Sequence, residues 1–304
     1  HNDEKLVRNP IQISYSVLEK LNIPVPTDND IRIKLSFDGE PEIIANTDFK
    51  VYADGELVAE VTDLSSVKVE DDLIELNNRE VGYKESVRFE TDGILEIKNY
   101  ENRPAWNQAL NDNIFRGVLE VIKDDGELVV INELDLEDYL KGLGEVLNAD
   151  PTEKIKALMV AARTYAKYYM EIDEKFPGKD YHLDDDPNVS QKYLGYGFEL
   201  RAPNIAAAVN STAGEVVTYK GEIVKTPYFS SSDGEATKSA EDVWGWDFTP
   251  YLKSVSDTYC NGTYFYGHGV GLSGCGSKGM ADAGYNYEEI LKHYYTGIEI
   301  EDLY

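Results

Sequence analysis

Basic residues and cysteine are scarce in this 304-residue sequence. Lys and Arg number 29 against 57 Asp and Glu, which leaves a formal net charge of −28. A surface of this sign repels nucleic-acid phosphates and anionic lipid headgroups, so neither is an expected partner. The two cysteines, Cys260 and Cys275, allow one disulfide at most, which excludes a disulfide-rich scaffold. Whether they are bonded depends on the compartment, and the sequence leaves it open.

Long hydrophobic runs are also absent. The longest apolar stretches, such as residues 157–162, fall far short of the roughly 20 residues that a membrane-spanning helix needs, so no transmembrane segment is predicted. The chain begins with His1 rather than Met, and the lack of a targeting segment therefore says nothing against secretion. A chain of this length and aromatic content can bury a sizeable core without metal or disulfide support.

The order of sequence patterns predicts an α+β fold in which a β-rich module is joined to a mixed domain. Residues 1–27 form a polar lead-in segment. Residues 28–115 contain short runs that alternate apolar and polar residues between Asp-Gly turns, which is typical of strands. Residues 116–304 mix a hairpin near 118–131, a helix from 136 to about 147 and a helix opening at Asp150-Pro151 with further short elements. These do not alternate regularly enough for a doubly wound sheet.

Two charged residues on the predicted helices are candidates for chemistry. Glu145 lies about 200° around its helix from Leu143, away from the apolar stripe, so spacing alone favours a solvated glutamate. Arg163 follows the stripe residue Ala162 and is expected at the edge of the buried face. It either approaches Glu145 or forms an ordinary ion pair between helices, and the sequence leaves both interpretations open.

Two loops add hydroxyls and a histidine. Ser230-Ser231-Ser232-Asp233-Gly234 suits a polyhydroxylated ligand, although a hydrogen-bonded turn is the simpler interpretation, and no Gly-x-Ser-x-Gly elbow is present there. The stretch 267–274 contains Gly-x-Gly-x-x-Gly, but too little chain follows for a dinucleotide-binding unit. Its glycines allow close backbone approach around His268, which favours a functional or site-scaffolding role for that residue.

A metal site is not predicted. His182 with Asp184, Asp185 and Asp186 supplies suitable ligand types, but the loop lacks the Gly and Glu of an EF-hand. The two cysteines stand 15 residues apart without histidines at zinc spacing. A solvated acidic loop is the preferred interpretation, and no cofactor is expected.

Several motifs in order resemble the stage II sporulation protein D family, whose relatives include amidase enhancers. They cover roughly residues 116–300, and residues 31–100 resemble the family's β-rich amino-terminal part more loosely. The matching stretches are Leu136–Gly142 followed by Glu145, Ile155–Ala157, Val160–Ala166, Tyr228–Ser232, Ser239–Gly245, Pro250–Val255, Gly267–Gly271 and Tyr287–Tyr295.

The resemblance implies a peptidoglycan lytic transglycosylase, in the cell envelope or secreted, that acts on glycan strands held in a cleft. Glu145 matches the family's catalytic acid. It would protonate the oxygen between N-acetylmuramic acid and N-acetylglucosamine, then take a proton from the muramic six-hydroxyl as the 1,6-anhydro ring closes. A close Arg163 would lower the pKa of such an acid, so Arg163 is assigned to substrate binding or scaffold. The predicted substrate-binding residues are Lys156, Arg163, Tyr165, Ser230, Ser231, Ser232, Asp242, Trp244, His268 and Ser273.

The sequence departs from the family pattern at several places. Val146-Leu147 replaces Met-Pro after the catalytic acid, and Leu158 replaces the glutamine of Lys-Ala-Gln. Residues 272–277 replace Met-Ser-Gln-Tyr-Gly-Ala. In the stretch that matches a zinc-binding loop of some relatives, both cysteines and one histidine are replaced and only His182 could still bind the metal, so no structural zinc is predicted. These departures keep a second hypothesis open, that of a non-catalytic glycan-binding module that enhances a cell-wall amidase as its partner.

Overall fold

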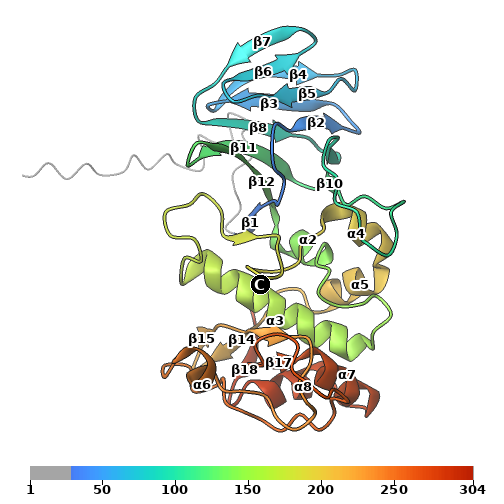
Figure 1. The fold of residues 1–304 in the computed structure, drawn as a ribbon, viewed down its shortest axis with the longest axis vertical. Helices are drawn as coiled ribbons and strands as arrows, with labels where there is room; N and C mark the ends of the chain where they lie inside the picture. The colour runs from blue at the N-terminus through green and yellow to red at the C-terminus, as the bar shows by residue number, and fades with distance from the viewer. Residues whose placement is uncertain (1–28, 304) are drawn as a thin grey trace, which may run out of the picture.

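The computed structural model describes residues 29–303, and the predicted lead-in of residues 1–27 lies outside them. Strands dominate the first hundred described residues and helices follow, so the predicted α+β class is confirmed (Figure 1). The first strands are β1 Asp30–Lys34, β2 Glu42–Ala45, β3 Phe49–Ala53, β4 Glu56–Val61, β5 Val67–Val69, β6 Leu73–Leu76, β7 Arg79–Gly82, β8 Ser86–Glu90 and β9 Leu95–Ile97.

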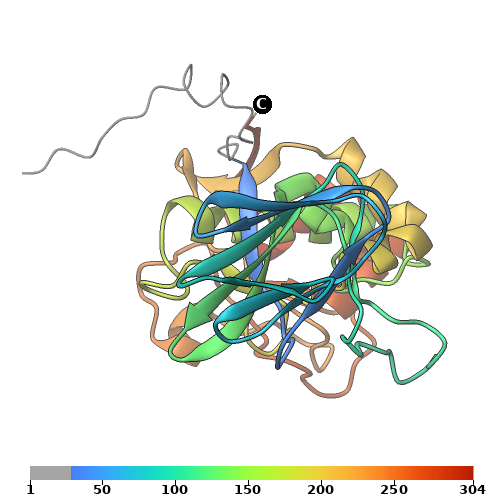
Figure 2. The same cartoon turned by 90° about the horizontal axis from the view of Figure 1, so that it is seen from above.

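Two sheets form the β-rich part. β10 Ile114–Phe115 closes a six-stranded sheet of order β10-β9-β2-β5-β6-β7. A seven-stranded sheet of order β13-β1-β12-β11-β8-β3-β4 includes β11 Val118–Asp124, β12 Glu127–Asp135 and β13 Leu183–Asp184. Alternate residues of the strands, such as Val87 and Phe89 of β8, enter one hydrophobic core that both sheets share. Figure 2 shows the strands of this part from above.

The larger sheet crosses the predicted boundary at residues 115 and 116. β11 pairs with β8 of the β-rich module, and β12 pairs with β1, where Asp30 lies opposite Asp135. The hairpin predicted near residues 118–131 is therefore present, and it joins the two predicted domains through backbone hydrogen bonds. The helical part is attached directly to the end of β12.

A long helix lies at the centre of the carboxy-terminal half. The helices are α2 Leu136–Lys141, α3 Thr152–Glu171, α4 Gly195–Arg201, α5 Pro203–Ser211, α6 Ala240–Trp244, α7 Gly274–Asp282 and α8 Tyr287–Tyr294. Every residue of α3 from 157 to 164 is buried, so this stretch is covered on all sides rather than along one stripe. It contacts α5, α7, α8 and β14 (Figure 1).

Short strands complete the fold around α3. β14 Glu215–Tyr219 lies between β15 Glu222–Ile223 and β18 Glu299–Asp302, and β16 Tyr228–Phe229 pairs in parallel with β17 Leu272–Ser273. The parallel pair joins two segments more than 40 residues apart in sequence. Within residues 29–303, no helix has the length and apolar character needed to span a membrane.

The helix predicted through Leu147 is wrong in its length, because α2 ends at Lys141. The chain beyond it pairs with residues 192–194 instead: Gly144 N–H donates to the Lys192 carbonyl at 2.8 Å, and Leu194 N–H donates to Gly142 at 2.9 Å. A Cβ on Gly142 would lie 2.5 Å from the Tyr193 ring, so glycine is needed for this approach. Glu145 therefore stands on a loop rather than on a helix.

The glycine-rich stretch is only partly a loop, because a helix begins at Gly274. Ser273 caps α7 by accepting a hydrogen bond from Gly276 N–H. A Cβ on Gly276 would come within 1.8 Å of Asp257 Oδ1 and 2.1 Å of the Tyr294 hydroxyl. Glycine is unfavourable in helix interiors because of its low helix propensity, but here it lets α7 pack tightly against these two groups.

Gly276→Ala should lower the free energy of unfolding by at least about 1–3 kcal/mol, because the added methyl overpacks this contact. Urea denaturation measures the loss. Gly82→Ala is the matched control, since the atom nearest to its added methyl would be the Asp72 carbonyl oxygen at 3.8 Å. Equal stability of the two variants would contradict the tight packing of α7.

Candidate functional site

Glu145 is held at one end by the backbone of a distant segment. The amide of Lys192 donates to Glu145 Oε1 at 2.6 Å, and the neighbouring Gly144 is bound to the carbonyl of the same lysine. These contacts fix the loop after α2 against residues 192–194. The glutamate is half-buried, which differs from the solvated position that helix spacing favoured.

A hydrogen-bonded network of polar side chains lies behind Glu145. The Tyr139 hydroxyl donates to Gln191 Oε1 at 3.0 Å, and Gln191 Nε2 donates to the Tyr228 hydroxyl at 3.0 Å. The Tyr228 hydroxyl in turn lies close enough to the Glu145 carboxylate to lower its pKa. Gln191 is buried and also donates to the Ala162 carbonyl on α3 at 3.3 Å. The network thus connects the glutamate to α2, α3 and β16.

Burial raises the pKa of Glu145 above its ordinary value. The Lys192 amide, the Lys192 charge and the Tyr228 hydroxyl each oppose the shift by stabilising the carboxylate, but burial is the largest cause. The charge of Glu145 acts on Tyr139, Tyr165 and Tyr228, whose own pKa values are raised chiefly by burial. The result is a carboxyl group that keeps its proton to higher pH than an exposed glutamate.

His268 joins the same site through the backbone of Tyr228. Its Nδ1 accepts from Val270 N–H at 3.0 Å, and the backbone of Tyr228 lies close enough to the ring to raise its pKa. Burial lowers the pKa of His268, so the neutral ring is favoured. The ring centroid lies 5.0 Å from that of Trp244, which in turn lies 4.5 Å from Trp246. Aromatic faces of this kind suit the apolar faces of sugar rings.

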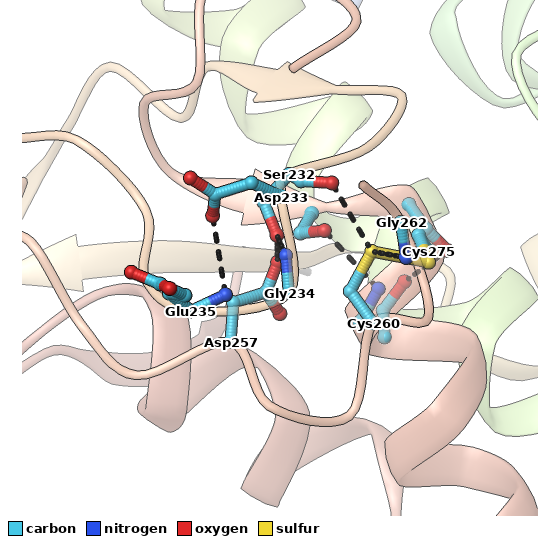
Figure 3. Close-up of a disulfide and its surroundings, with 12 residues drawn as sticks. Ser232, Asp233, Gly234, Glu235, Asp257, Cys260, Gly262 and Cys275 are labelled. Atoms are coloured by element: carbon cyan, nitrogen blue, oxygen red, sulfur yellow. Dashed lines mark hydrogen bonds between the residues drawn. A yellow bond between two sulfur atoms is a disulfide. The ribbon is translucent and has the colours of Figure 1, made fainter. Parts of the chain in front are cut away.

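The predicted serines divide into exposed and structural groups. Ser230 is exposed and Ser231 half-buried, and both backbone amides approach the Tyr266 carbonyl. Ser232 is fully buried and donates to Asp257 Oδ2 at 2.6 Å (Figure 3). Ser273 is buried as the cap of α7. Neither Ser232 nor Ser273 has surface to offer a ligand.

The two cysteines form a disulfide beside these serines, which answers the question that the sequence left open. Cys260 and Cys275 have Cα atoms 4.9 Å apart (Figure 3). The amide of Cys275 donates to the Ser230 carbonyl at 2.9 Å. The disulfide therefore fastens the start of α7 to the segment that carries Asp257, next to the serine loop.

Arg163 belongs to the scaffold rather than to a ligand surface. It is fully buried, and its Nε and Nη2 each lie 2.7 Å from a carboxylate oxygen of Glu137 on α2. Nη1 donates to the Glu215 carbonyl of β14 at 3.1 Å. Of the two interpretations of Arg163, the ordinary ion pair between helices is the one observed, and the side chain has no surface for a substrate.

The other predicted binding residues lie at different distances from this network. Tyr165 is close enough to Glu145 for its pKa to respond to that charge. Lys156 pairs with Glu153 at 3.2 Å and lies over the Tyr287 ring. Ser239 caps α6 by accepting from the Asp242 amide, and its hydroxyl donates to the Asp242 carboxylate. Glu145, Tyr165, Trp244 and His268 are thus connected, whereas within residues 29–303 no hydrogen bond, ion pair or ring contact links the side chains of Lys156 or Asp242 to them.

Three residues of the network behind Glu145 were not predicted as site residues: Tyr139, Gln191 and Tyr228. Tyr139 lies on the predicted helix that starts at residue 136, and only its buried hydroxyl distinguishes it from a core residue. Gln191 ends the stretch that resembles the zinc-binding loop of some relatives, and Tyr228 opens a motif that resembles the family. Those motif positions were the available signal.

The acidic loop after β13 is held by hydrogen bonds of its own. His182 Nδ1 accepts from Arg32 N–H at 3.0 Å, and Asp185 accepts from Ser36. Burial raises the pKa of Asp185 to about 6. Across residues 29–303, no group of three His, Cys, Asp or Glu residues is arranged to hold a metal ion.

A model of the stage II sporulation protein family matches residues 124–219. This segment carries Glu145, all of α3 and Gln191. Residues 124–219 belong to the stage II sporulation protein D family. The resemblance inferred from the motifs is thereby confirmed for these residues.

Three relatives are similar to parts of this chain. An uncharacterized protein of Brachyspira hyodysenteriae is 35% identical over 77% of this chain and 60% of its own length. The stage II sporulation protein D of Bacillus subtilis is 30% identical over 42% of this chain and 40% of its own. The amidase enhancer of Bacillus subtilis is 34% identical over 35% of this chain and 13% of its own. The chain thus spans about 60% and 40% of the first two relatives.

Arg163→Met should lower the free energy of unfolding by about 3–5 kcal/mol, because it leaves the Glu137 carboxylate without its partner in a largely buried position. Chemical denaturation measures this loss. Lys156→Met, two turns earlier on α3, removes a half-exposed ion pair and should change stability by less than about 1 kcal/mol. A stable Arg163→Met variant would contradict the scaffold role.

Proposed function

We propose that this protein is a peptidoglycan lytic transglycosylase with Glu145 as general acid and base. The observation that carries the proposal is the state of Glu145, a half-buried carboxyl group whose pKa is raised by burial and which is held by the Lys192 amide and Tyr228. The family match and the names of two relatives support a role related to the bacterial cell wall.

The environment of Glu145 suits donation of a proton to a glycosidic oxygen. Because its pKa is raised, Glu145 keeps its proton to higher pH than an ordinary glutamate, and it can protonate the leaving sugar as the bond between N-acetylmuramic acid and N-acetylglucosamine breaks. The carboxylate that remains is stabilised by the Lys192 amide and the Tyr228 hydroxyl. It can then take the proton of the muramic six-hydroxyl, which attacks the oxocarbenium-like centre and closes the 1,6-anhydro ring.

A mechanism with a single carboxylate fits the charges around Glu145. The charge that acts on the pKa of Glu145 is that of Lys192, which stabilises its carboxylate. Hydrolases that activate water or form a glycosyl-enzyme intermediate use a second carboxylate within roughly 5–10 Å. Internal attack by the sugar's own hydroxyl needs neither the second carboxylate nor a positioned water.

The disulfide supports a location outside the cytoplasm. Disulfides persist in oxidising compartments and are rare where thiols are kept reduced. The Cys260–Cys275 bond therefore agrees with an envelope or secreted protein that meets peptidoglycan.

A second candidate function is a glycan-binding module that enhances a cell-wall amidase without cleaving the strand. The similarity to an amidase enhancer favours it, as do the residues after Glu145 and after His268 that depart from the family pattern. The aromatic surface of Trp244 and His268 would serve either function. The two candidates differ in whether Glu145 performs chemistry.

Glu145→Gln should abolish release of 1,6-anhydro-muramic products, with a loss of about 10²-fold or more, because the amide cannot donate or accept the proton. Mass spectrometry of products from purified glycan strands measures it, since hydrolysis would add the mass of water. The exposed Glu222→Gln is the matched control and should keep full activity. Strands that are bound but left intact by the wild-type protein would favour the amidase-enhancer candidate instead.

Tyr228→Phe should extend activity to higher pH. The protonated form of Glu145 is the active acid, so activity falls as pH rises through its raised pKa. The Tyr228 hydroxyl lowers that pKa by stabilising the carboxylate, and its removal lets the pKa rise further. The pH profile of product release checks this shift. Tyr219→Phe, whose ring packs against Tyr251, should leave the profile unchanged. A profile of Tyr228→Phe that moved to lower pH would contradict this role.

A further inference from the structure

A cavity of about 620 Å³ opens at the carboxyl end of α3 and along the segment that follows it. Charged side chains line much of it, and most of them have a partner. Glu171 pairs with Lys167 at 2.7 Å, and Asp173 pairs with Lys225 at 2.9 Å. Lys179 pairs with Asp124 and Asp125 at 2.7 and 2.6 Å, and Glu174 accepts from Gly178 N–H.

Among the described charged residues that line the cavity, Lys175 is the one without such a partner. Its ammonium lies 5.8 Å from the ring centroid of Tyr165 and 5.3 Å from that of Tyr169. Within the part of the chain that the structure describes, no carboxylate lies within ion-pair distance of it and it donates no hydrogen bond. A lysine in a protein of net charge −28 thus stands without an acidic partner.

The surroundings of Lys175 make an anion favourable there. The side chain is half-buried, and the Lys225 ammonium lies over the same Tyr169 ring at 5.1 Å. Burial and the neighbouring charge of Lys225 lower the pKa of Lys175, and Asp184 opposes this shift only weakly. A desolvated cation that lacks a counter-charge is costly, and a bound carboxylate would remove that cost.

Aromatic rings lie between Lys175 and the surroundings of Glu145. The ammonium of Lys175 lies over the ring of Tyr165, and the charge of Glu145 raises the pKa of the same tyrosine. The rings of Tyr165 and Tyr169 meet edge to face with their centroids 4.9 Å apart. On the other side, Lys225 lies over Trp246, which stacks on Trp244 beside His268. A series of ring contacts through Tyr165 and Tyr169 therefore leads from the unpaired lysine toward the acid.

We infer that Lys175 forms a subsite that binds a carboxylate of the muramic acid unit while a neighbouring glycosidic bond lies at Glu145. The inference rests on the proposed function, because the glycan strand is the substrate of that function. Two carboxylates share this chemistry. One is the lactyl group of muramic acid, which is free only in strands stripped of peptide, and the other belongs to the stem peptide. An ammonium over tyrosine faces can bind either by a charge-assisted hydrogen bond.

The test measures binding without turnover, in full-length protein that carries Glu145→Gln. Lys175→Gln is added to it and compared with Lys179→Gln, which removes the same charge from the same cavity but at a lysine already paired with two aspartates. Three ligands of equal length serve as probes: stem-stripped glycan strands, stem-bearing strands, and an N-acetylglucosamine oligomer that has no carboxylate.

Lys175→Gln should raise the Kd for a carboxylate-bearing strand about tenfold or more and leave that for the uncharged oligomer unchanged. A loss confined to stripped strands identifies the lactyl carboxylate, and a loss confined to stem-bearing strands identifies the peptide. An unchanged Kd for both strands would overturn the subsite. An equal rise in the Kd for the uncharged oligomer would overturn it too. So would an equal rise in the Kd for the strands caused by Lys179→Gln.

Product analysis of the wild-type protein separates the two proposals. Strands that bind through Lys175 but yield no anhydro product overturn the transglycosylase and leave the subsite standing. Anhydro product with an unchanged Kd for the Lys175 variant overturns the subsite alone. Failure of every strand to bind overturns both.

Discussion

The ion pair between Arg163 and Glu137 is the interaction on which the candidate site depends. It joins α2 to the fully buried centre of α3, and the arginine also binds the β14 backbone. Removing either charge alone leaves the other without compensation in a low-dielectric interior, so the two helices keep a single relative position. The loop that carries Glu145 leaves α2 directly, and Tyr165 stands on α3. Their mutual position therefore follows from this pair.

The glutamate itself is set by burial more than by the charge of the molecule. The net charge of −28 is spread over a surface that solvent and salt screen, whereas desolvation acts directly on Glu145 and is the largest cause of its raised pKa. An acidic surface does not oppose a sugar chain as it opposes nucleic acid. It does make the unpaired Lys175 unusual, because acidic side chains are plentiful and, among the described residues, none lies within ion-pair distance of its ammonium.

Much of the fold could be predicted from local patterns. Alternation predicted the strands of the β-rich module, and the hairpin predicted near residues 118–131 is present as β11 and β12. The patterns failed where long-range contacts override local preference. α2 stops at Lys141 because residues 142–144 pair with residues 192–194, and α7 begins among glycines because only glycine fits beside Asp257 and Tyr294.

The sequence by itself determined the class of fold, the family motifs and Glu145 as the acid to consider, because these depend on periodicity and on the order of residues. Tertiary structure decided what those residues do. It placed Arg163 in an ion pair, gave Glu145 its partners Lys192 and Tyr228, and joined Cys260 to Cys275. Burial and hydrogen bonding are properties of residues brought together from far apart in the chain, and spacing along one helix cannot contain them.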